Sequence, residues 1–72
     1  MNLGYLSLKN IEPLNGLKNL IILKLSNNSQ LSDISPLSSL VNLEKLVLGK
    51  TSVTNYKPVE GIKHLKIEII NW

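Results

Sequence analysis

The sequence predicts an α/β solenoid in which short parallel strands alternate with tight helical or extended return segments. Three observations carry this prediction: an internal repeat, a change of apolar spacing inside each repeat, and a proline at one fixed position of every repeat. A chain of 72 residues holds one domain, and the stacking of repeat units lets such a small chain build a shared core.

The repeat has a period of about 22 residues. At this shift a set of leucines falls on an equivalent set, and an Asn or Asp and a Pro recur at fixed positions. The matches are Leu17, Leu20, Leu23 and Leu25 with Leu40, Leu43, Leu46 and Leu48; Asn10 with Asp33 and Asn55; and Pro13 with Pro36 and Pro58. Further along, the pattern continues if one residue is dropped between Leu65 and Ile67. We therefore expect one domain over residues 1–72, divided into a partial repeat 1–16, repeats 17–39 and 40–61, and a partial repeat 62–72.

Each unit contains a segment in which leucine recurs at every second position. Leu23 and Leu25 are separated by one residue, and so are Leu46 and Leu48, as in a strand with one buried face. We expect strands over residues 20–26, 43–49 and about 65–71. Because successive strands run in the same direction one repeat apart, they should form a parallel ladder.

The rest of each unit has an apolar residue at every third position, as from Leu31 through Ile34 to Leu37. This spacing is typical of a 3₁₀-like or polyproline-like path. Pro36 suits the first turn of a helical segment, and Ser35 before it is expected to provide the cap. We expect the Asp33 carboxylate to accept hydrogen bonds from backbone amides of the turn rather than to act as an acid.

The composition limits the functions that the chain can serve. Hydrophobic residues make up 43% of the chain and aromatic residues 4%, so aliphatic side chains fill the interior. The absence of Cys excludes disulfides, zinc sites built on thiolates and thiol catalysis. No export signal or membrane-spanning segment is visible, which leaves the compartment open. The net charge of +3 comes from lysines that are scattered along the chain, a weak signal for a polyanionic partner.

One consensus runs through the central unit: Leu20-x-x-Leu23-x-Leu25-x-x-Asn28, followed by Leu31-x-Asp-Ile34-x-Pro-Leu37-x-x-Leu40. This pattern closely resembles the leucine-rich repeat in its internalin-like, bacterial form, over residues 8–69 of this chain. The resemblance implies a short right-handed arc, or horseshoe segment, with the strands on the concave face and 3₁₀ or extended segments on the convex face.

The resemblance also gives the turn after the strand a structural role. It implies that Asn28 lies inside this turn and that its amide bonds to backbone groups of adjacent coils, which fits the need to pair buried main-chain groups. The second unit departs from the pattern, since Thr51 holds the Asn position, and in the third unit only Asn71 is near it. The first unit carries an extra residue, placed at Ser29 or Gln30.

Residues between the strand leucines should face solvent, and the resemblance implies that this concave surface binds other proteins. The alternative for each residue is an ordinary solvated sheet face. The candidates are Ile22, Lys24 and Ser26, aligned with Lys45, Val47 and Gly49, and then with Lys66, Glu68 and Ile70. The like charges of Lys45 and Lys66, side by side on the ladder, would be tolerated if solvated or facing an acidic partner.

Catalysis has little support in the sequence. The single His64 has no Cys and no nearby carboxylate at ligand spacing, and no glycine-rich phosphate loop is present. The lysines lack interleaved aromatic residues, which argues against a nucleic-acid surface. We therefore expect no enzyme activity, no cofactor and no membrane insertion, and we expect a protein partner whose identity the sequence does not give.

Two alternatives remain open. Terminal repeats of a solenoid normally carry a polar outer face, and neither end of this chain shows such a cap. The chain could therefore be a fragment or remnant of a longer repeat array, such as a surface adhesin or an intracellular regulatory subunit, without activity of its own. The same uncapped ends could also allow self-association.

Overall fold

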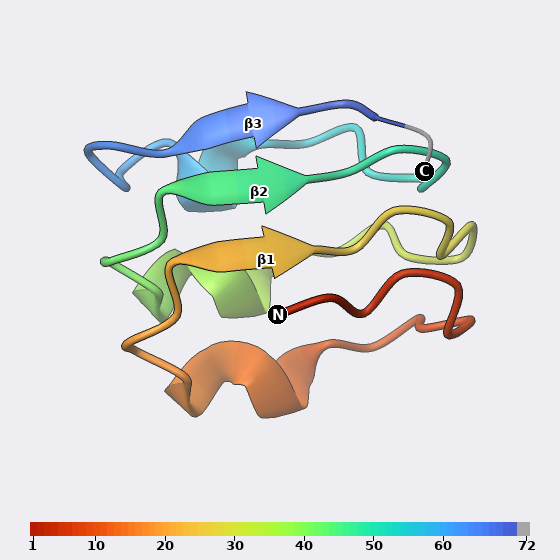
Figure 1. The fold of residues 1–72 in the computed structure, drawn as a ribbon, viewed down its shortest axis with the longest axis horizontal. Helices are drawn as coiled ribbons and strands as arrows, with labels where there is room; N and C mark the ends of the chain where they lie inside the picture. Colours follow the sequence, from red (N-terminus) through yellow and green to blue (C-terminus); the bar gives the residue numbers. More distant parts are fainter. Residues whose placement is uncertain (71–72) are drawn as a thin grey trace.

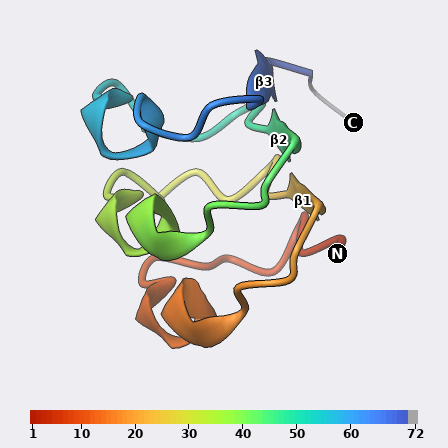
Figure 2. The ribbon, with the colours of Figure 1, turned by 90° about the vertical axis from the view of Figure 1, so that its left-hand side faces the viewer.

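The structure is a computed structural model that describes residues 1–70. The expected end of the third strand and the third turn position, Asn71, lie outside the described residues. The chain winds as a solenoid, with strands stacked on one side and 3₁₀ helices on the other (Figures 1 and 2). The predicted short solenoid of parallel strands and 3₁₀ returns is confirmed.

The three strands are β1 (Ile22–Lys24), β2 (Lys45–Val47) and β3 (Lys66–Glu68), in that order in one parallel sheet. They are shorter than expected, because the chain bends into a turn soon after each apolar pair. The backbone ladder nevertheless continues past them, with Leu25 N–H donating to Val47 O at 2.9 Å and Leu48 N–H donating to Glu68 O at 2.8 Å. Leu46 pairs with Ile67 in the register, so the expected single-residue deletion in the last unit is confirmed.

A fourth rung of the ladder, which the sequence reasoning missed, lies at the N-terminus. Asn2 forms a parallel bridge with Lys24. Around it, Leu3 N–H donates to Lys24 O at 2.8 Å, and Lys24 N–H donates to Met1 O at 2.9 Å. The spacing held a signal for this rung, because Met1 and Leu3 stand 22 residues before Leu23 and Leu25.

The N-terminal coil is residues 1–21, the β1 coil is 22–44, the β2 coil is 45–65, and β3 opens the last, incomplete coil. The returns are the 3₁₀ helices η1 (Glu12–Gly16), η2 (Ser35–Ser39) and η3 (Lys57–Val59). Each has proline in its first turn, where the missing N–H and the fixed φ suit a helix start.

The entry to each return is set by an Asn or Asp two residues before the helix. Asp33 Oδ1 accepts the Ser35 N–H at 2.9 Å, and Asn10 and Asn55 accept the equivalent amides in their own coils. The expected role of Asp33 is thus confirmed, whereas the expected cap by Ser35 is wrong, since Ile34 holds the cap position. Hydrogen bonds from the backbone and the side chain of Ser35 lower the pKa of the Asp33 carboxyl from its ordinary 3.8.

The core is a column of aliphatic side chains between strands and returns. Its members in the β1 coil are completely or almost completely buried: Leu23, Leu25, Leu31, Ile34, Leu37, Leu40 and Leu43. Leu17, the repeat equivalent of Leu40, is 38% exposed because it belongs to the N-terminal coil, which is packed on one side only. Burial in this fold therefore depends on neighbouring coils.

Polar side chains also tie the coils together outside the core. Ser39 Oγ donates to Asn15 O at 2.7 Å, and Asn42 Nδ2 donates to Lys18 O at 2.9 Å, from the β1 coil back to the N-terminal coil. Ser52 Oγ donates to Ser29 O at 2.6 Å, from the β2 coil to the β1 coil. These bonds satisfy backbone carbonyls where no regular ladder reaches them.

Candidate binding face

The outward surface of β1, β2 and β3, here called the strand face, gathers the nine candidate residues into rows. The register sets Ile22 beside Lys45 and Lys45 beside Lys66. The second row consists of Lys24, Val47 and Glu68. The third expected row, Ser26, Gly49 and Ile70, is joined by hydrogen bonds rather than by strand pairing.

Exposure divides these nine residues. Ile22 is 44% exposed, Lys66 and Ile70 are exposed, and Lys24, Lys45 and Glu68 are half-buried. The expectation that all nine face solvent is wrong for three residues that are buried: Ser26, Val47 and Gly49.

Val47 is completely buried although it stands outside the core cluster. It occupies an outward position on the central strand, between Lys24 and Glu68 in the ladder, with Lys45 two residues before it. The long aliphatic stems of such neighbours can cover a short branched side chain while their charged ends reach water. Strand alternation predicts which way a side chain points, but the neighbours decide whether it is covered.

Ser26 is buried because its hydroxyl connects three coils. Its Oγ accepts the Gly49 N–H at 3.0 Å and donates to Ile70 O at 2.8 Å. Gly49 places no side chain on the outward side between these partners, so the chain after β3 can approach β1 across it. The contacts of Ser26, Gly49 and Ile70 with one another therefore hold the coils together.

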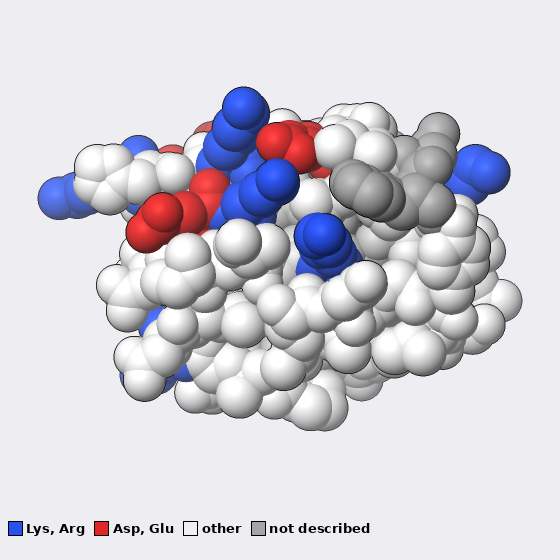
Figure 3. All heavy atoms as spheres, viewed as in Figure 1, with Lys and Arg blue, Asp and Glu red and all other residues white. Residues whose placement is uncertain are grey.

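The charges of the strand face are partly paired. Glu68 lies 3.5 Å from Lys45 Nζ and 3.9 Å from Lys66 Nζ, so it offsets the like charges of the two neighbouring lysines. Both pairs are at least partly solvated and contribute little to stability. With Lys24, the nine candidate residues include three lysines and one glutamate. Figure 3 shows basic and acidic side chains together on the side of the strands. The strand face is therefore electropositive.

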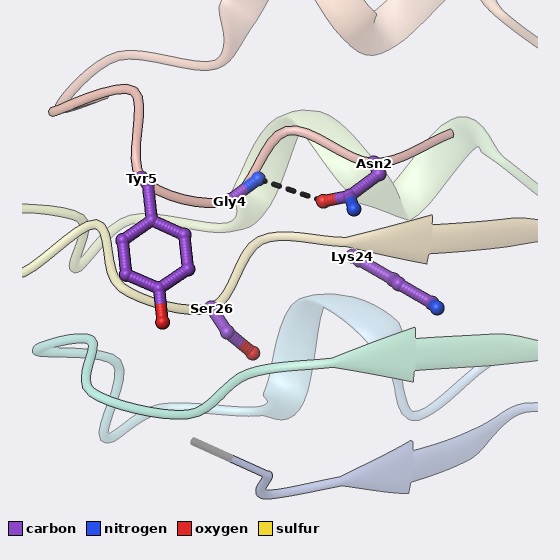
Figure 4. Close-up of a pocket in the computed structure, with 5 residues that line it drawn as sticks. All are labelled: Asn2, Gly4, Tyr5, Lys24 and Ser26. Carbon is purple, nitrogen blue, oxygen red and sulfur yellow. Dashed lines mark hydrogen bonds between the residues drawn. The ribbon is translucent and has the colours of Figure 1, made fainter. Parts of the chain in front are cut away.

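A hollow of about 210 Å³ lies at the N-terminal edge of the strand face. As Figure 4 shows, its lining comes from the first residues and from β1 and the segment after it: Asn2, Gly4, Tyr5, Lys24 and Ser26. No carboxylate lines it, whereas an amide, two hydroxyls and an ammonium group do. The hollow therefore offers both hydrogen-bond donors and acceptors, together with one positive charge.

Tyr5 is the residue of this hollow that the sequence reasoning missed. It is 69% exposed and has a positive φ of 61°. The conformation belongs to the repeat, because the equivalent Asn27 and Lys50 also have positive φ, at 64° and 52°. The turns after the N-terminal rung, β1 and β2 thus all use the left-handed region, and in the N-terminal coil this turn presents an aromatic ring to solvent.

The turn residue Asn28 is fully buried and holds two coils together. Its Oδ1 accepts the N–H groups of Leu8 at 2.9 Å and Leu6 at 3.2 Å. Its Nδ2 donates to Leu25 O at 2.8 Å and to Leu3 O at 3.0 Å. One carboxamide therefore satisfies backbone groups of both the N-terminal coil and the β1 coil.

Thr51, at the equivalent position of the next coil, makes a different contact. Its Oγ1 accepts the Val53 N–H at 3.4 Å within its own turn. The link back to the β1 coil is made by Ser52, whose N–H donates to Leu31 O at 2.8 Å and whose hydroxyl bonds to Ser29. The sequence pattern located the substitution at Thr51 but gave no signal for the replacement by Ser52.

Within residues 1–70, no group of three or more His, Asp or Glu side chains is arranged to hold a metal ion. The same part of the chain contains no helix of the length and hydrophobicity needed to cross a membrane. His64 is exposed at a turn before β3.

A comparison with known proteins shows what this fold is similar to. No protein-family model matches the chain, and no curated protein matches it. Among solved structures, it is similar to internalin C2 from Listeria monocytogenes, with a TM-score of 0.80 and 30% sequence identity. The match covers 86% of this chain and 27% of that protein, so this chain spans about a quarter of its length.

This chain itself has a parallel ladder with one strand per coil, 3₁₀ returns with proline in the first turn, and a column of stacked leucines. The sequence pattern, the fold and the comparison agree. This chain is an internalin-like leucine-rich-repeat solenoid.

Proposed function

We propose that the chain is a non-catalytic protein-interaction module that binds its partner through the strand face and the adjoining hollow. Leucine-rich-repeat folds of this type are protein-interaction scaffolds, which supports a binding role in general. The observation that carries the specific proposal is the position of Tyr5 and Ile22. Both are well exposed: Tyr5 lines the hollow, in the turn after the N-terminal rung, and Ile22 begins β1 on the strand face.

The chemistry of this surface favours one kind of partner. Aromatic side chains are common anchors in protein interfaces because they bury a large area and lose little conformational freedom. Lys24 lines the hollow together with Tyr5, and Lys45 lies beside Ile22 in the strand register. A partner with an apolar contact surrounded by acidic side chains would complement this arrangement and would be attracted to it at a distance.

The test compares a row of residues on the strand face with a control row of the same amino-acid composition. The strand-face row is Ile22, Lys45 and Lys66, one aliphatic residue and two lysines. The control row, Lys18, Val41 and Lys63, has the same composition at one repeat position outside the strands, and all three residues are exposed. Each row is changed to serine. A partner is first trapped by a photo-crosslinker placed at Tyr5 in the full chain, and its affinity is then measured by calorimetry.

Serine at the strand-face row should weaken binding by at least about tenfold, since the contact loses apolar area and two charges. Serine at the control row should leave the affinity within about twofold, since isolated surface changes have small effects. Equal loss of affinity in the two triple variants, or loss only in the control, would contradict the assignment to the strand face.

The second proposal is that the chain acts as part of a longer repeat array. It is supported by the match to about a quarter of internalin C2 and by the apolar residues exposed in the first and last coils. In that case the isolated chain would unfold with low cooperativity and would not bind a partner. A monomer that melts in one sharp transition well above room temperature would remove the support for this proposal.

A further inference from the structure

The dipeptide Asn15-Gly16, at the end of η1, has a sequence that favours a spontaneous reaction of asparagine. A glycine has no side chain to shield its own backbone nitrogen, so this nitrogen can reach the side-chain carbonyl carbon of the residue before it. Asn15 is the only asparagine of the sequence that glycine follows. Both residues are exposed, and no other part of the chain lies within 4 Å of the place that a Cβ of Gly16 would take.

The carboxamide of Asn15 is also free to turn, whereas hydrogen bonds hold the carboxamides of most other asparagines. The side-chain oxygens of Asn10 and Asn55 each accept an amide two residues ahead, at 2.9 and 3.1 Å. The Asn42 carboxamide donates to the N-terminal coil, and the Asn28 carboxamide is bonded at both its oxygen and its nitrogen. Among residues 1–70, no hydrogen bond involves the Asn15 carboxamide. It can therefore turn towards the next backbone nitrogen.

The exposure of Asn15 belongs to its repeat position and does not depend on the open side of the N-terminal coil. Ser38 holds the equivalent position in the β1 coil, which is packed on both sides, and it is exposed as well. The position after it also accepts a side chain, since Ser39 stands there in the β1 coil. Gly16 does not have a positive φ, so Gly16→Ala fits the fold and can serve as a test.

We propose that Asn15 is a site of spontaneous deamidation in the folded chain. The Gly16 nitrogen attacks Cγ of Asn15: the new N–Cγ bond forms, the Cγ–Nδ2 bond breaks, and the proton of the attacking nitrogen leaves with ammonia. Water then opens the cyclic imide at either carbonyl and gives aspartate or isoaspartate. The last turn of η1 has to open for the attack, because the next nitrogen does not face the side chain in a helical backbone. A 3₁₀ helix of five residues has few hydrogen bonds to lose in this opening.

Either product places a carboxylate where one is already present. Glu12 stands three positions before Asn15 on the same short helix, and both line a hollow of about 270 Å³ between η1 and η2. The lining contains no cation: Glu12, Asn15, Ser35, Pro36, Ser38 and Ser39. The new carboxylate is therefore not compensated within the hollow, and its repulsion with Glu12 should weaken η1.

The isoaspartate form also changes a link between coils. The backbone carbonyl of Asn15 accepts the Ser39 hydroxyl at 2.7 Å. In isoaspartate the backbone runs through Cβ and Cγ, so it is one atom longer, and the former backbone carbonyl becomes part of a free carboxylate. We expect the N-terminal coil to pack less tightly on the β1 coil. Figure 2 shows η1 and η2 on the side away from the strands, so the strand face should be unchanged.

The experiment is incubation of the folded chain in mildly alkaline buffer, followed by peptide mapping with mass spectrometry, which detects the exchange of NH₂ for OH at each asparagine. Asn19 is the internal control, because it lies in the same coil, is exposed and is followed by leucine. Asn15 should convert while Asn19 stays intact. Gly16→Ala should slow the conversion by at least about fivefold, since alanine holds a helical turn better than glycine does. The chain in urea gives the rate without η1.

Conversion of Asn19 at the same rate, or an unchanged rate in Gly16→Ala, overturns the proposal. So does a folded chain that keeps Asn15 intact while the chain in urea converts it, because η1 would then protect the site. The products are separated by chromatography and compared by hydrogen exchange at Leu17, whose N–H donates to Leu14 O at 3.1 Å. Exchange there should be fastest in the isoaspartate form, and exchange equal to that of the native chain would contradict the loosening of this coil. Neither result depends on binding through the strand face.

Discussion

The β1 coil and the N-terminal coil contain the same repeat, yet their interiors differ. In the β1 coil, packed on both sides, the repeat leucines are buried, and in the N-terminal coil the same positions are partly open to solvent. Residue type does not explain the difference, since Leu17 and Leu40 are both leucine. In a stack, burial of a residue is a property of the neighbouring coil as much as of its own.

The largest effect is expected from truncating equivalent leucines in the two coils. Leu40→Ala should lower the free energy of unfolding by about 4 kcal/mol, because it leaves a cavity at a closed position. Leu17→Ala should lower it by about 1.5 kcal/mol, since this side chain is already partly hydrated. Urea unfolding of the two variants measures both values. Equal losses would mean that the N-terminal coil is as well packed as the β1 coil.

The turn residues should differ almost as much. Asn28→Ala removes the partner of two N–H groups and of carbonyl groups in two coils, and should lower the free energy of unfolding by about 3 kcal/mol. Thr51→Ala removes one long local bond and should lower it by about 0.5 kcal/mol. Hydrogen exchange at Leu6 and Leu8 should accelerate in Asn28→Ala alone. Unchanged exchange there would contradict the bridging role of the carboxamide.

A smaller effect of opposite sign is expected at Lys50, which has a φ of 52°. Asn tolerates the left-handed region better than Lys and already occupies it at Asn27, so Lys50→Asn should raise the free energy of unfolding by about 0.5 kcal/mol. Lys63→Asn is the control, an exposed lysine without positive φ. Thermal unfolding of both variants decides the matter, and equal stabilisation would show that the gain comes from charge and not from backbone conformation.

The smallest expected effect is on the stability of the fold at acid pH. The pKa of Asp33 is lowered by its bonds to Ser35, so its contribution is present above the unfolded pKa of about 3.8 and is lost as pH falls through the folded pKa. Asp33→Asn keeps an acceptor at the position that Asn10 and Asn55 hold in their coils. Between about pH 5 and pH 2 the variant should therefore lose less stability than the native chain, measured as the urea midpoint. Parallel midpoint curves would contradict this.

The sequence predicted the structure that all coils share, but few of the contacts between coils that differ in sequence. The strands, the proline returns and the missing residue before Ile67 follow from local spacing, which the fold preserves. The rung at Asn2 was missed because Leu6 stands where the Asn of the pattern would be, so the first coil looked incomplete. The burial of Val47 and the bond from Ser52 to the Ser29 carbonyl depend on groups of adjacent coils, which the pattern of a single coil does not describe.

The Ser26 hydroxyl has a mechanical consequence. A stack held by contacts between adjacent coils can peel from one end, one coil at a time. Ser26 bonds to both Gly49 and Ile70, and so joins the first strand directly to the chain beyond the third. A force applied at the C-terminal end would load this bond while β2 and β3 are still in place. Because this bond reaches past β2, the chain after β3 separates from the stack only once its link to the β1 coil has broken.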